Sequence, residues 1–92
     1  MKVRFELSKR LAEMAGFPGG DVEVGEGSTV HDALATLTGS FANGSGSGVV
    51  KAGSLHPAVL VVVDGEACLP ERRDRVLSGG ETIDLFLPIA GG

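Results

Sequence analysis

The sequence has 92 residues, of which 42% are apolar and 22% charged, and its formal net charge is −4. This length fits a single domain with a modest core, and the scattered basic residues lack the electrostatic footprint of a nucleic-acid-binding protein. The single cysteine, Cys68, excludes an intramolecular disulfide framework. No apolar run approaches the roughly 18 residues of a membrane span. We therefore expect a cytoplasmic protein that binds neither nucleic acid nor membrane.

Alternating apolar and charged residues from 2 to 7 predict a half-buried strand at the start of the chain. Ser8 is positioned to cap a short helix in which Leu11, Met14 and Ala15 share one face. Glycines and a proline between residues 16 and 20 are expected to end this helix and turn the chain. A second alternation at residues 21–24 predicts a second strand, so the two strands would form a hairpin-like pair with a short helical connection.

The main helix is expected to begin after Thr29. Thr29 and Asp32 resemble a capping box, with Asp where Glu or Gln is usual. Apolar residues at 30, 33, 34 and 37 then follow helical spacing and mark a face for burial. Gly39 is expected to end the helix.

Residues 39–57 are expected to form a flexible insertion rich in glycine and serine. Within it, residues 43–48 alternate Asn or Ser with Gly, a composition that behaves as a flexible coil. Such a stretch can be mistaken for a phosphate-binding loop, but the sequence has neither the Gly-Lys-Ser/Thr ending nor the preceding strand of that motif. We therefore favour a linker over a phosphate site.

The second half of the chain contains three predicted strands. The apolar run from Ala58 to Val63 suits a strand that is buried on both faces or central in a sheet. Asp64-Gly65 predicts a hairpin turn, residues 66–69 a short returning strand, and Pro70 its end. Residues 72–77 then cross over to the last strand. In that strand, alternate side chains point in opposite directions: Ile83, Leu85 and Leu87 to one face, and Thr82, Asp84 and Phe86 to the other.

This order of elements predicts an α+β fold, with one main helix packed across a mixed sheet of four or five strands. Residues 1–87 would form a single domain, and residues 88–92 an extended C-terminal tail. Because Gly91 and Gly92 have no Cβ, they can thread a channel too narrow for other side chains and carry the α-carboxylate into a partner's active site. Gly92 is thus the candidate reacting residue, and the rest of the tail would enter the channel: Pro88, Ile89, Ala90 and Gly91.

Three stretches of the chain carry a resemblance to a known family. They are the opening Val3-Arg4-Phe5 with Leu11-Ala12-Glu13-Met14-Ala15-Gly16, the hairpin Val61-Val62-Val63-Asp64-Gly65-Glu66, and the ending Leu77-Ser78-Gly79-Gly80-Glu81-Thr82-Ile83 with Phe86-Leu87-Pro88-Ile89-Ala90-Gly91-Gly92. With the order of the elements, they resemble the MoaD/ThiS-like sulfur carriers, and most closely the small subunit of molybdopterin synthase. The resemblance covers nearly the whole chain and implies a ubiquitin-like β-grasp fold.

The resemblance also implies a chemistry for the tail. A ubiquitin-activating-enzyme-like adenylyltransferase would use ATP to adenylate Gly92, and sulfur delivered by a sulfurtransferase would convert it to a thiocarboxylate. That sulfur would pass to a small molecule on a larger enzyme, such as the large subunit of molybdopterin synthase. The chain would then be a carrier rather than an enzyme and would bind no cofactor of its own.

Two other functions stay open from the sequence. A ubiquitin-like protein modifier would use the same activated Gly92 to form isopeptide bonds with lysine side chains. A simple β-grasp interaction domain would have no use for the tail.

The sequence contains several other candidate site residues. Phe86 shares its strand face with Asp84, so it either anchors a docking partner or packs under a loop, and Ile89 is a weaker candidate for docking. Cys68 lies in a short apolar strand and suits burial better than sulfur relay. His31 and His56 have no third partner at metal spacing, so no metal site is expected. The remaining charged candidates suit solvent exposure or turn chemistry: Arg72, Arg73 and Arg75 in the crossover, and Asp64 and Glu66 at the hairpin.

Overall fold

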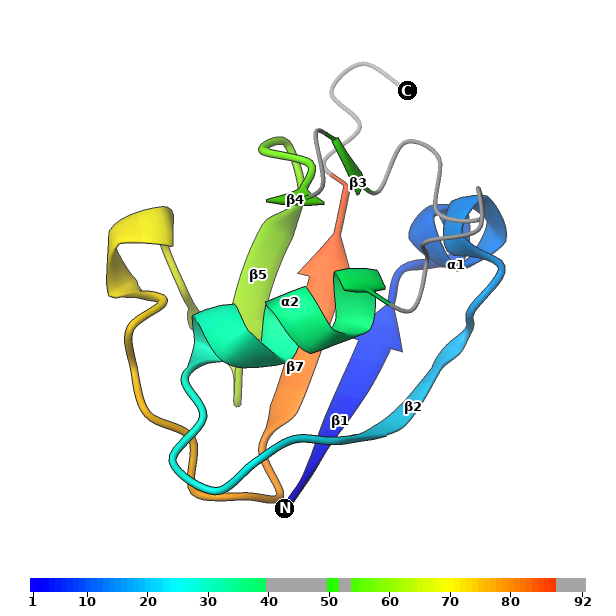
Figure 1. Cartoon of the computed structure of the whole chain (residues 1–92). Helices are drawn as coiled ribbons and strands as arrows, with labels where there is room; N and C mark the ends of the chain where they lie inside the picture. The colour runs from blue at the N-terminus through cyan, green and yellow to red at the C-terminus, as the bar shows by residue number, and fades with distance from the viewer. Residues whose placement is uncertain (40–49, 52–53, 88–92) are drawn as a thin grey trace.

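The computed structural model describes residues 1–39, 50–51 and 54–87, and Figure 1 shows how they are arranged. Along the chain these residues form β1 (Lys2–Leu7), α1 (Lys9–Ala15), β2 (Gly19–Glu23), α2 (Val30–Gly39), β3 (Val50–Lys51), β4 (Ser54–Leu55), β5 (Leu60–Val63), β6 (Glu66–Ala67), the 3₁₀ turn η1 (Pro70–Arg72) and β7 (Thr82–Phe86). The predictions made for residues 40–49 and 88–92 lie outside this described part of the chain.

Five strands form one mixed sheet in the order β2-β1-β7-β5-β6. β1 and β7 run parallel, while the other neighbouring strands are antiparallel. The last strand, β7, therefore lies at the centre of the sheet with a hydrogen-bonded neighbour on each side. This confirms the predicted α+β arrangement of a mixed sheet with a main helix packed across it.

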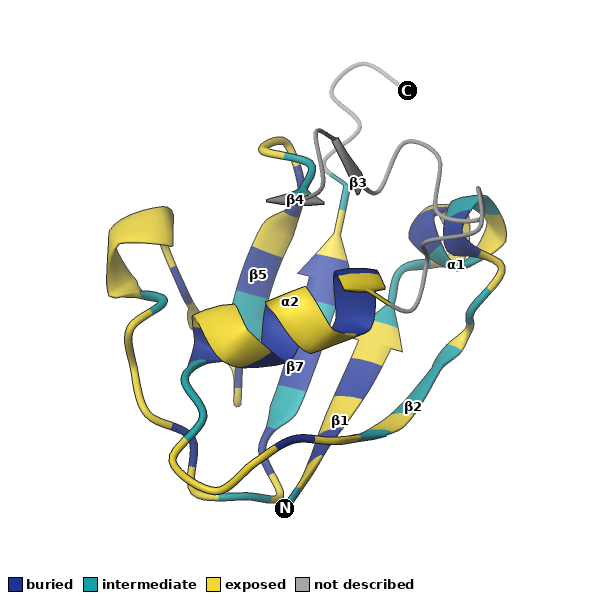
Figure 2. Ribbon diagram, viewed as in Figure 1, coloured by how far each residue is buried: buried dark blue, intermediate teal, exposed yellow. Residues whose placement is uncertain are grey.

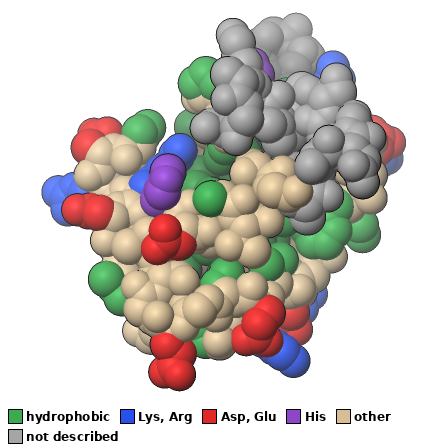
Figure 3. Space-filling view, in the orientation of Figure 1, with side chains coloured by type: hydrophobic (Ala, Val, Ile, Leu, Met, Phe, Trp, Pro, Cys, Tyr) green, Lys and Arg blue, Asp and Glu red, His purple; other side chains and the backbone are tan. Residues whose placement is uncertain are grey.

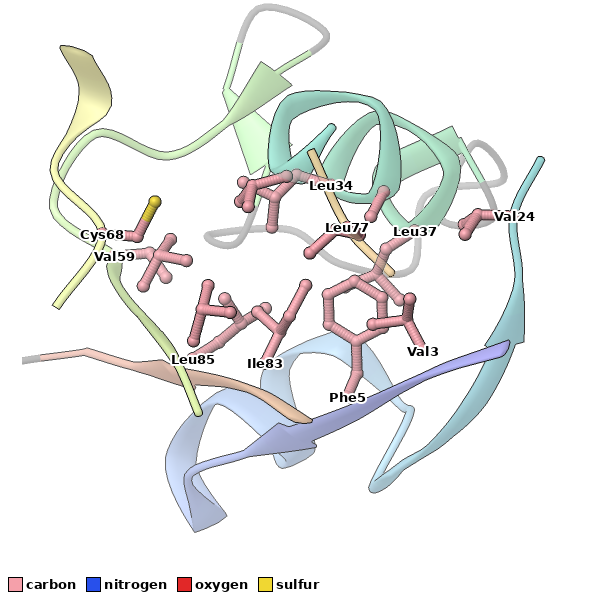
Figure 4. Close-up of a cluster of buried hydrophobic side chains, with 14 of the residues drawn as sticks. Val3, Phe5, Val24, Leu34, Leu37, Val59, Cys68, Leu77, Ile83 and Leu85 are labelled. Atoms are coloured by element: carbon pink, nitrogen blue, oxygen red, sulfur yellow. The ribbon is translucent and has the colours of Figure 1, made fainter. Parts of the chain in front are cut away.

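α2 covers one face of the sheet and turns its apolar stripe inward, as Figure 2 shows by burial. The residues predicted from helical spacing are all buried: Val30, Ala33, Leu34 and Leu37. The sheet contributes Phe5, Ile83 and Leu85, each 0% exposed. Figure 4 shows these three side chains pointing from β1 and β7 toward the helix. The core thus lies between α2 and one face of the sheet.

The predicted capping box at the start of α2 is confirmed. Thr29 Oγ1 accepts a hydrogen bond from the Asp32 backbone N–H at 3.1 Å, and Asp32 Oδ2 accepts one from the Thr29 backbone N–H at 3.0 Å. The backbone hydrogen bond from Thr29, with a smaller contribution from its side chain, lowers the pKa of Asp32. The helix therefore begins where the sequence predicted, and it ends at Gly39.

α1 also matches its prediction in position, but not in its cap. It follows Ser8 and ends at Gly16, which adopts the left-handed conformation with φ of 68°. The Ser8 side chain, however, makes no capping hydrogen bond. Leu11 and Ala15 are buried on the predicted face, and the position of α1 is set by this packing.

The prediction that residues 19 and 20 turn the chain was wrong. Gly19 and Gly20 instead begin β2, where they pair with Glu6 and Phe5 of β1. A Cβ on Gly19 would lie 2.6 Å from the Phe5 carbonyl oxygen. Glycine is thus required at position 19 because the two strands come close together there. In the sequence, a glycine required for such a close approach cannot be told apart from a glycine in a turn.

The prediction for the apolar run at residues 58–63 was also wrong in one respect. The strand begins at Leu60, and its burial alternates, with Leu60 51% exposed and Val61 and Val63 buried. Successive side chains of a strand point to opposite faces of the sheet, so Leu60 points away from the core that Val61 and Val63 join. The other alternative, a strand inside the sheet, is confirmed, because β5 pairs with β7 on one side and with β6 on the other.

The hairpin after β5 follows the prediction closely. Asp64 and Gly65 both have positive φ, 49° and 84°, as a two-residue type I′ turn requires, and they connect Val63 to its partner Glu66. β6 is shorter than predicted because it ends at Ala67, before η1 begins at Pro70.

The flexible insertion expected over residues 39–57 stays a prediction, since residues 40–49 and 52–53 lie outside the described ranges. Within it, the structure describes β3 and β4, which pair with each other as a small antiparallel sheet. No pattern in the sequence predicted these two strands. Leu55 of β4 is partly buried and packs against the core.

Candidate functional site

The predicted reacting tail starts where β7 leaves the centre of the sheet. Leu87 follows β7 and packs, partly buried, against the core. The residues expected to react or to enter a partner's channel lie outside the described part of the chain, so their roles stay predictions: Pro88, Ile89, Ala90, Gly91 and Gly92. The structure does describe β7 and Leu87, the residues from which the tail starts. Because β7 is paired on both sides and Leu85 is fully buried, the tail starts from a fixed point.

Phe86 lies on the face of the sheet turned away from α2, which we call the outer face. Its side chain is 40% exposed, and its partner directly across β5 is Leu60, which is 51% exposed. Two large apolar side chains are therefore exposed next to each other at the end of β7 from which the tail leaves. The partial exposure of Phe86 leaves it accessible to a partner, and its docking role remains a prediction.

Leu60 was missed by the sequence analysis. A run of six apolar residues gives no alternation from which to decide which side chains face the core. The register with β7 supplies that information, because Val61 lies opposite buried Leu85 and Leu60 lies opposite exposed Phe86.

Two carboxylates lie beside this apolar pair on the outer face. Glu6 of β1 and Asp84 of β7 are register partners across the parallel strands. Partial burial, the nearby charge of Glu6 and a hydrogen bond with the Glu6 side chain raise the pKa of the Asp84 carboxyl. Arg4 Nε donates to Glu6 Oε2 at 3.1 Å. Among the ion pairs between described residues, none involves Asp84.

The other candidates from the sequence do not join this group. Cys68 is 7% exposed, and its Sγ lies 3.5 Å from the Arg72 carbonyl oxygen, so the predicted burial is confirmed. His56 Nδ1 accepts a hydrogen bond from the Ala58 N–H at 3.0 Å, a local turn contact. Within residues 1–39, 50–51 and 54–87, no set of three or more His, Cys, Asp or Glu side chains is placed to hold a metal ion.

Figure 3 shows the face that carries α2, where acidic, basic and apolar side chains are interspersed. None of the helices in the described ranges is long and apolar enough to span a membrane. On the outer face, by contrast with scattered single side chains, the exposed pair Leu60 and Phe86 lies at the end of β7 from which the tail starts.

Solved structures of several proteins are similar to this chain. Two crystal structures of SAMP1 of Haloferax volcanii, also described as small archaeal modifier protein 1, match the chain. The first has 29% sequence identity and a TM-score of 0.78, with 100% of both chains covered. The second has 30% identity and a TM-score of 0.76, with 96% of this chain and 98% of that chain covered. The Amycolatopsis orientalis BexX/CysO complex contains a chain with 23% identity and TM-score 0.66, covering 98% and 99% of the two chains.

A candidate molybdopterin converting factor, subunit 1, from Pyrococcus furiosus shares the fold at 18% identity and TM-score 0.62, with 97% of this chain and 99% of that chain covered. These likenesses confirm the ubiquitin-like β-grasp fold. No curated protein sequence matches the chain.

The family comparison covers most of the sequence, including the whole candidate site. The model of the ThiS family matches residues 6–92, from the end of β1 to the final glycine. The chain belongs to the ThiS family, within the ubiquitin-like group of sulfur carriers and modifiers.

Proposed function

We propose that the chain is a sulfur carrier whose C-terminal Gly92 carboxylate is adenylated, converted to a thiocarboxylate and used as a sulfur donor in cofactor biosynthesis. The observation that carries the proposal is the match of the ThiS family through residue 92, together with a central strand that leads directly into the Gly-Gly tail. Molybdopterin is the favoured product of the pathway, which the likeness to the Pyrococcus furiosus protein supports at the level of fold.

The proposed chemistry needs an external activator because a carboxylate at neutral pH is ionised and a poor electrophile. An oxygen of the Gly92 carboxylate attacks the α-phosphate of ATP, and pyrophosphate leaves. Hydrosulfide, supplied with the help of a sulfurtransferase, then attacks the carbonyl carbon of the acyl-adenylate. The new C–S bond forms as the C–O bond to AMP breaks, which gives the thiocarboxylate and AMP with no change in oxidation state.

The chain's own contribution is to present the tail, so it acts as a co-substrate rather than as an enzyme. The five residues 88–92 span at most about 17 Å when extended. Pro88 restricts one φ and so lowers the entropic cost of ordering the tail. Gly91 and Gly92 add no side chain that would widen the channel they must enter. Phe86, exposed next to the start of the tail, would anchor the activating enzyme or the larger sulfur-accepting enzyme.

Mass spectrometry of the intact protein tests the proposal. After incubation with the adenylyltransferase of the same organism, ATP and sodium sulfide, the mass should increase by the difference between sulfur and oxygen. Omitting ATP, or deleting Gly92, should abolish the increase. The mass of the untreated protein also checks a premise of the proposal, that Gly92 is the last residue of the mature chain. An unchanged mass with an enzyme that activates another carrier would exclude the proposed function.

A second candidate function is supported by the likeness to the small archaeal modifier protein 1 of H. volcanii. As a protein modifier, the chain would use the same acyl-adenylate, but a lysine amine would attack the carbonyl carbon and form an isopeptide bond. Tryptic Gly-Gly remnants on cellular lysines, lost when Gly92 is deleted, would support this function. Their absence from cells that express the chain would leave sulfur transfer alone.

A further inference from the structure

The outer face carries an apolar pair at the start of the tail. Leu60 and Phe86 face each other across β5 and β7, with exposures of 51% and 40%. Val62 and Ala67 are the next pair on this face, one row further from the tail. An exposed cross-strand pair of large apolar side chains gives a partner a compact area to bury.

A pair of carboxylates lies immediately beside that apolar pair. Asp84 is two residues before Phe86 on the same face of β7, and its neighbours in the row are Val62 on β5 and Glu6 on β1. Arg4 is bonded to Glu6, whereas no ion pair between described residues neutralises Asp84. The raised pKa of Asp84 reflects its partial burial and the repulsion from Glu6. The folded chain thus keeps an unfavourable charge contact on this face.

The length of the tail fixes where an enzyme that acts on Gly92 must lie. Leu87 is packed against the core, and the five residues after it reach at most about 17 Å. An enzyme that encloses Gly92 therefore lies close to the end of β7. The apolar pair and Asp84 are on the strands that surround this point.

We propose that the enzyme that acts on Gly92 docks on the outer face and places an arginine or lysine against Asp84 and Glu6 while it covers Leu60 and Phe86 with apolar side chains. This inference rests on the proposed function and adds the chemistry of the partner's surface. A cation between the two carboxylates would remove their repulsion and form charge-assisted hydrogen bonds. A partner without a basic side chain would leave Asp84 buried and unpaired, so the carboxylates would also select among partners.

The test measures ATP–pyrophosphate exchange by the adenylyltransferase of the same organism, with the full chain as the varied substrate. Asp84→Lys should raise the KM for the carrier about tenfold, the equivalent of roughly 1.4 kcal/mol, with little change in kcat. Glu26→Lys is the matched control, since Glu26 is exposed in the loop between β2 and α2 and belongs to no strand of the sheet. It makes the same change in net charge and should leave the KM unchanged.

A second variant keeps the test independent of folding defects. Asp84→Asn preserves the size of the side chain and removes only the charge. It should raise the KM less than Asp84→Lys does, and it should weaken the increase of the KM with ionic strength that the wild type shows. The double variant Leu60→Ala/Phe86→Ala should also raise the KM.

The outcomes separate this inference from the proposed function. If exchange proceeds and neither change at Asp84 alters the KM or its salt dependence, the basic contact is wrong and the proposed function stands. If Glu26→Lys raises the KM as much as Asp84→Lys, the effect is one of net charge and the docking site is wrong. If the wild type supports no exchange with an enzyme active on another carrier, the proposed function fails and the inference falls with it.

Discussion

A matched pair of leucine substitutions tests whether the outer face is open. Leu85 and Leu60 lie on the adjacent strands β7 and β5, but Leu85 is 0% exposed and Leu60 is 51% exposed. Leu85→Ala removes buried carbons and leaves a cavity, which costs about 2–5 kcal/mol. Leu60→Ala removes a half-buried side chain and leaves no enclosed cavity, so it should lower the free energy of unfolding by about 1 kcal/mol.

Urea unfolding followed by circular dichroism measures the difference. With a slope of about 2 kcal/mol per molar of urea, the midpoint should fall by about 1.5 M for Leu85→Ala and about 0.5 M for Leu60→Ala. A domain of this size has a total stability of only about 5–15 kcal/mol, so Leu85→Ala should leave the protein marginally folded. If Leu60→Ala lowers the midpoint as much as Leu85→Ala, Leu60 is covered in the folded protein and the docking face is wrong.

Three further predictions concern the charge pair and the local structure. The raised pKa of Asp84 means that its ionised carboxylate disfavours the folded state, so Asp84→Asn should raise the melting temperature at pH 7. This gain should vanish as the pH falls below 3.8, the ordinary pKa of an Asp side chain, because Asp84 is then protonated in both states. A gain that persists in acid would contradict the charge repulsion. Gly20→Ala should lower the free energy of unfolding by about 1–3 kcal/mol, because Gly20 has a positive φ. Gly19→Ala should lower it more, because the new Cβ would lie 2.6 Å from the Phe5 carbonyl oxygen. Equal urea midpoints for the two variants would show that β1 and β2 move apart at this contact without a cost in stability. Thr29→Ala removes one of the two capping hydrogen bonds of α2 and should cost about 1 kcal/mol by urea unfolding, whereas an unchanged midpoint would mean that the cap contributes nothing.

Local signals in the sequence were enough for most of the fold. The capping residues Thr29 and Asp32 placed the start of α2, and Asp64-Gly65 placed the hairpin, because each depends on backbone geometry within a few residues. The alternation in β7 correctly assigned Phe86 to the outer face. These features need no knowledge of the tertiary structure.

The errors arose where tertiary contacts decide the outcome. Gly19 is needed because β1 comes close to it, and a sequence cannot separate that cause from a turn. Leu60 is exposed because it lies on the face of β5 opposite to buried Val61 and Val63, which an unbroken apolar run does not reveal.

The candidate site was predicted only in part for the same reason. Phe86 could be selected from its strand face, but the pairing of Asp84 with Glu6 depends on the parallel register of β1 with β7. These residues are far apart in the sequence, so only the topology brings them together.

Fragmentation of the intact, loaded protein in a mass spectrometer decides whether the Gly92 carboxyl is the reacting group. After reaction with the adenylyltransferase, ATP and sodium sulfide, we expect one oxygen to be replaced by sulfur and only fragments that contain Gly92 to carry the change. Sulfur on fragments that contain Cys68 but lack Gly92 would show that another group reacts, and a chain left unmodified by an enzyme that loads another carrier would show that Gly92 is not activated.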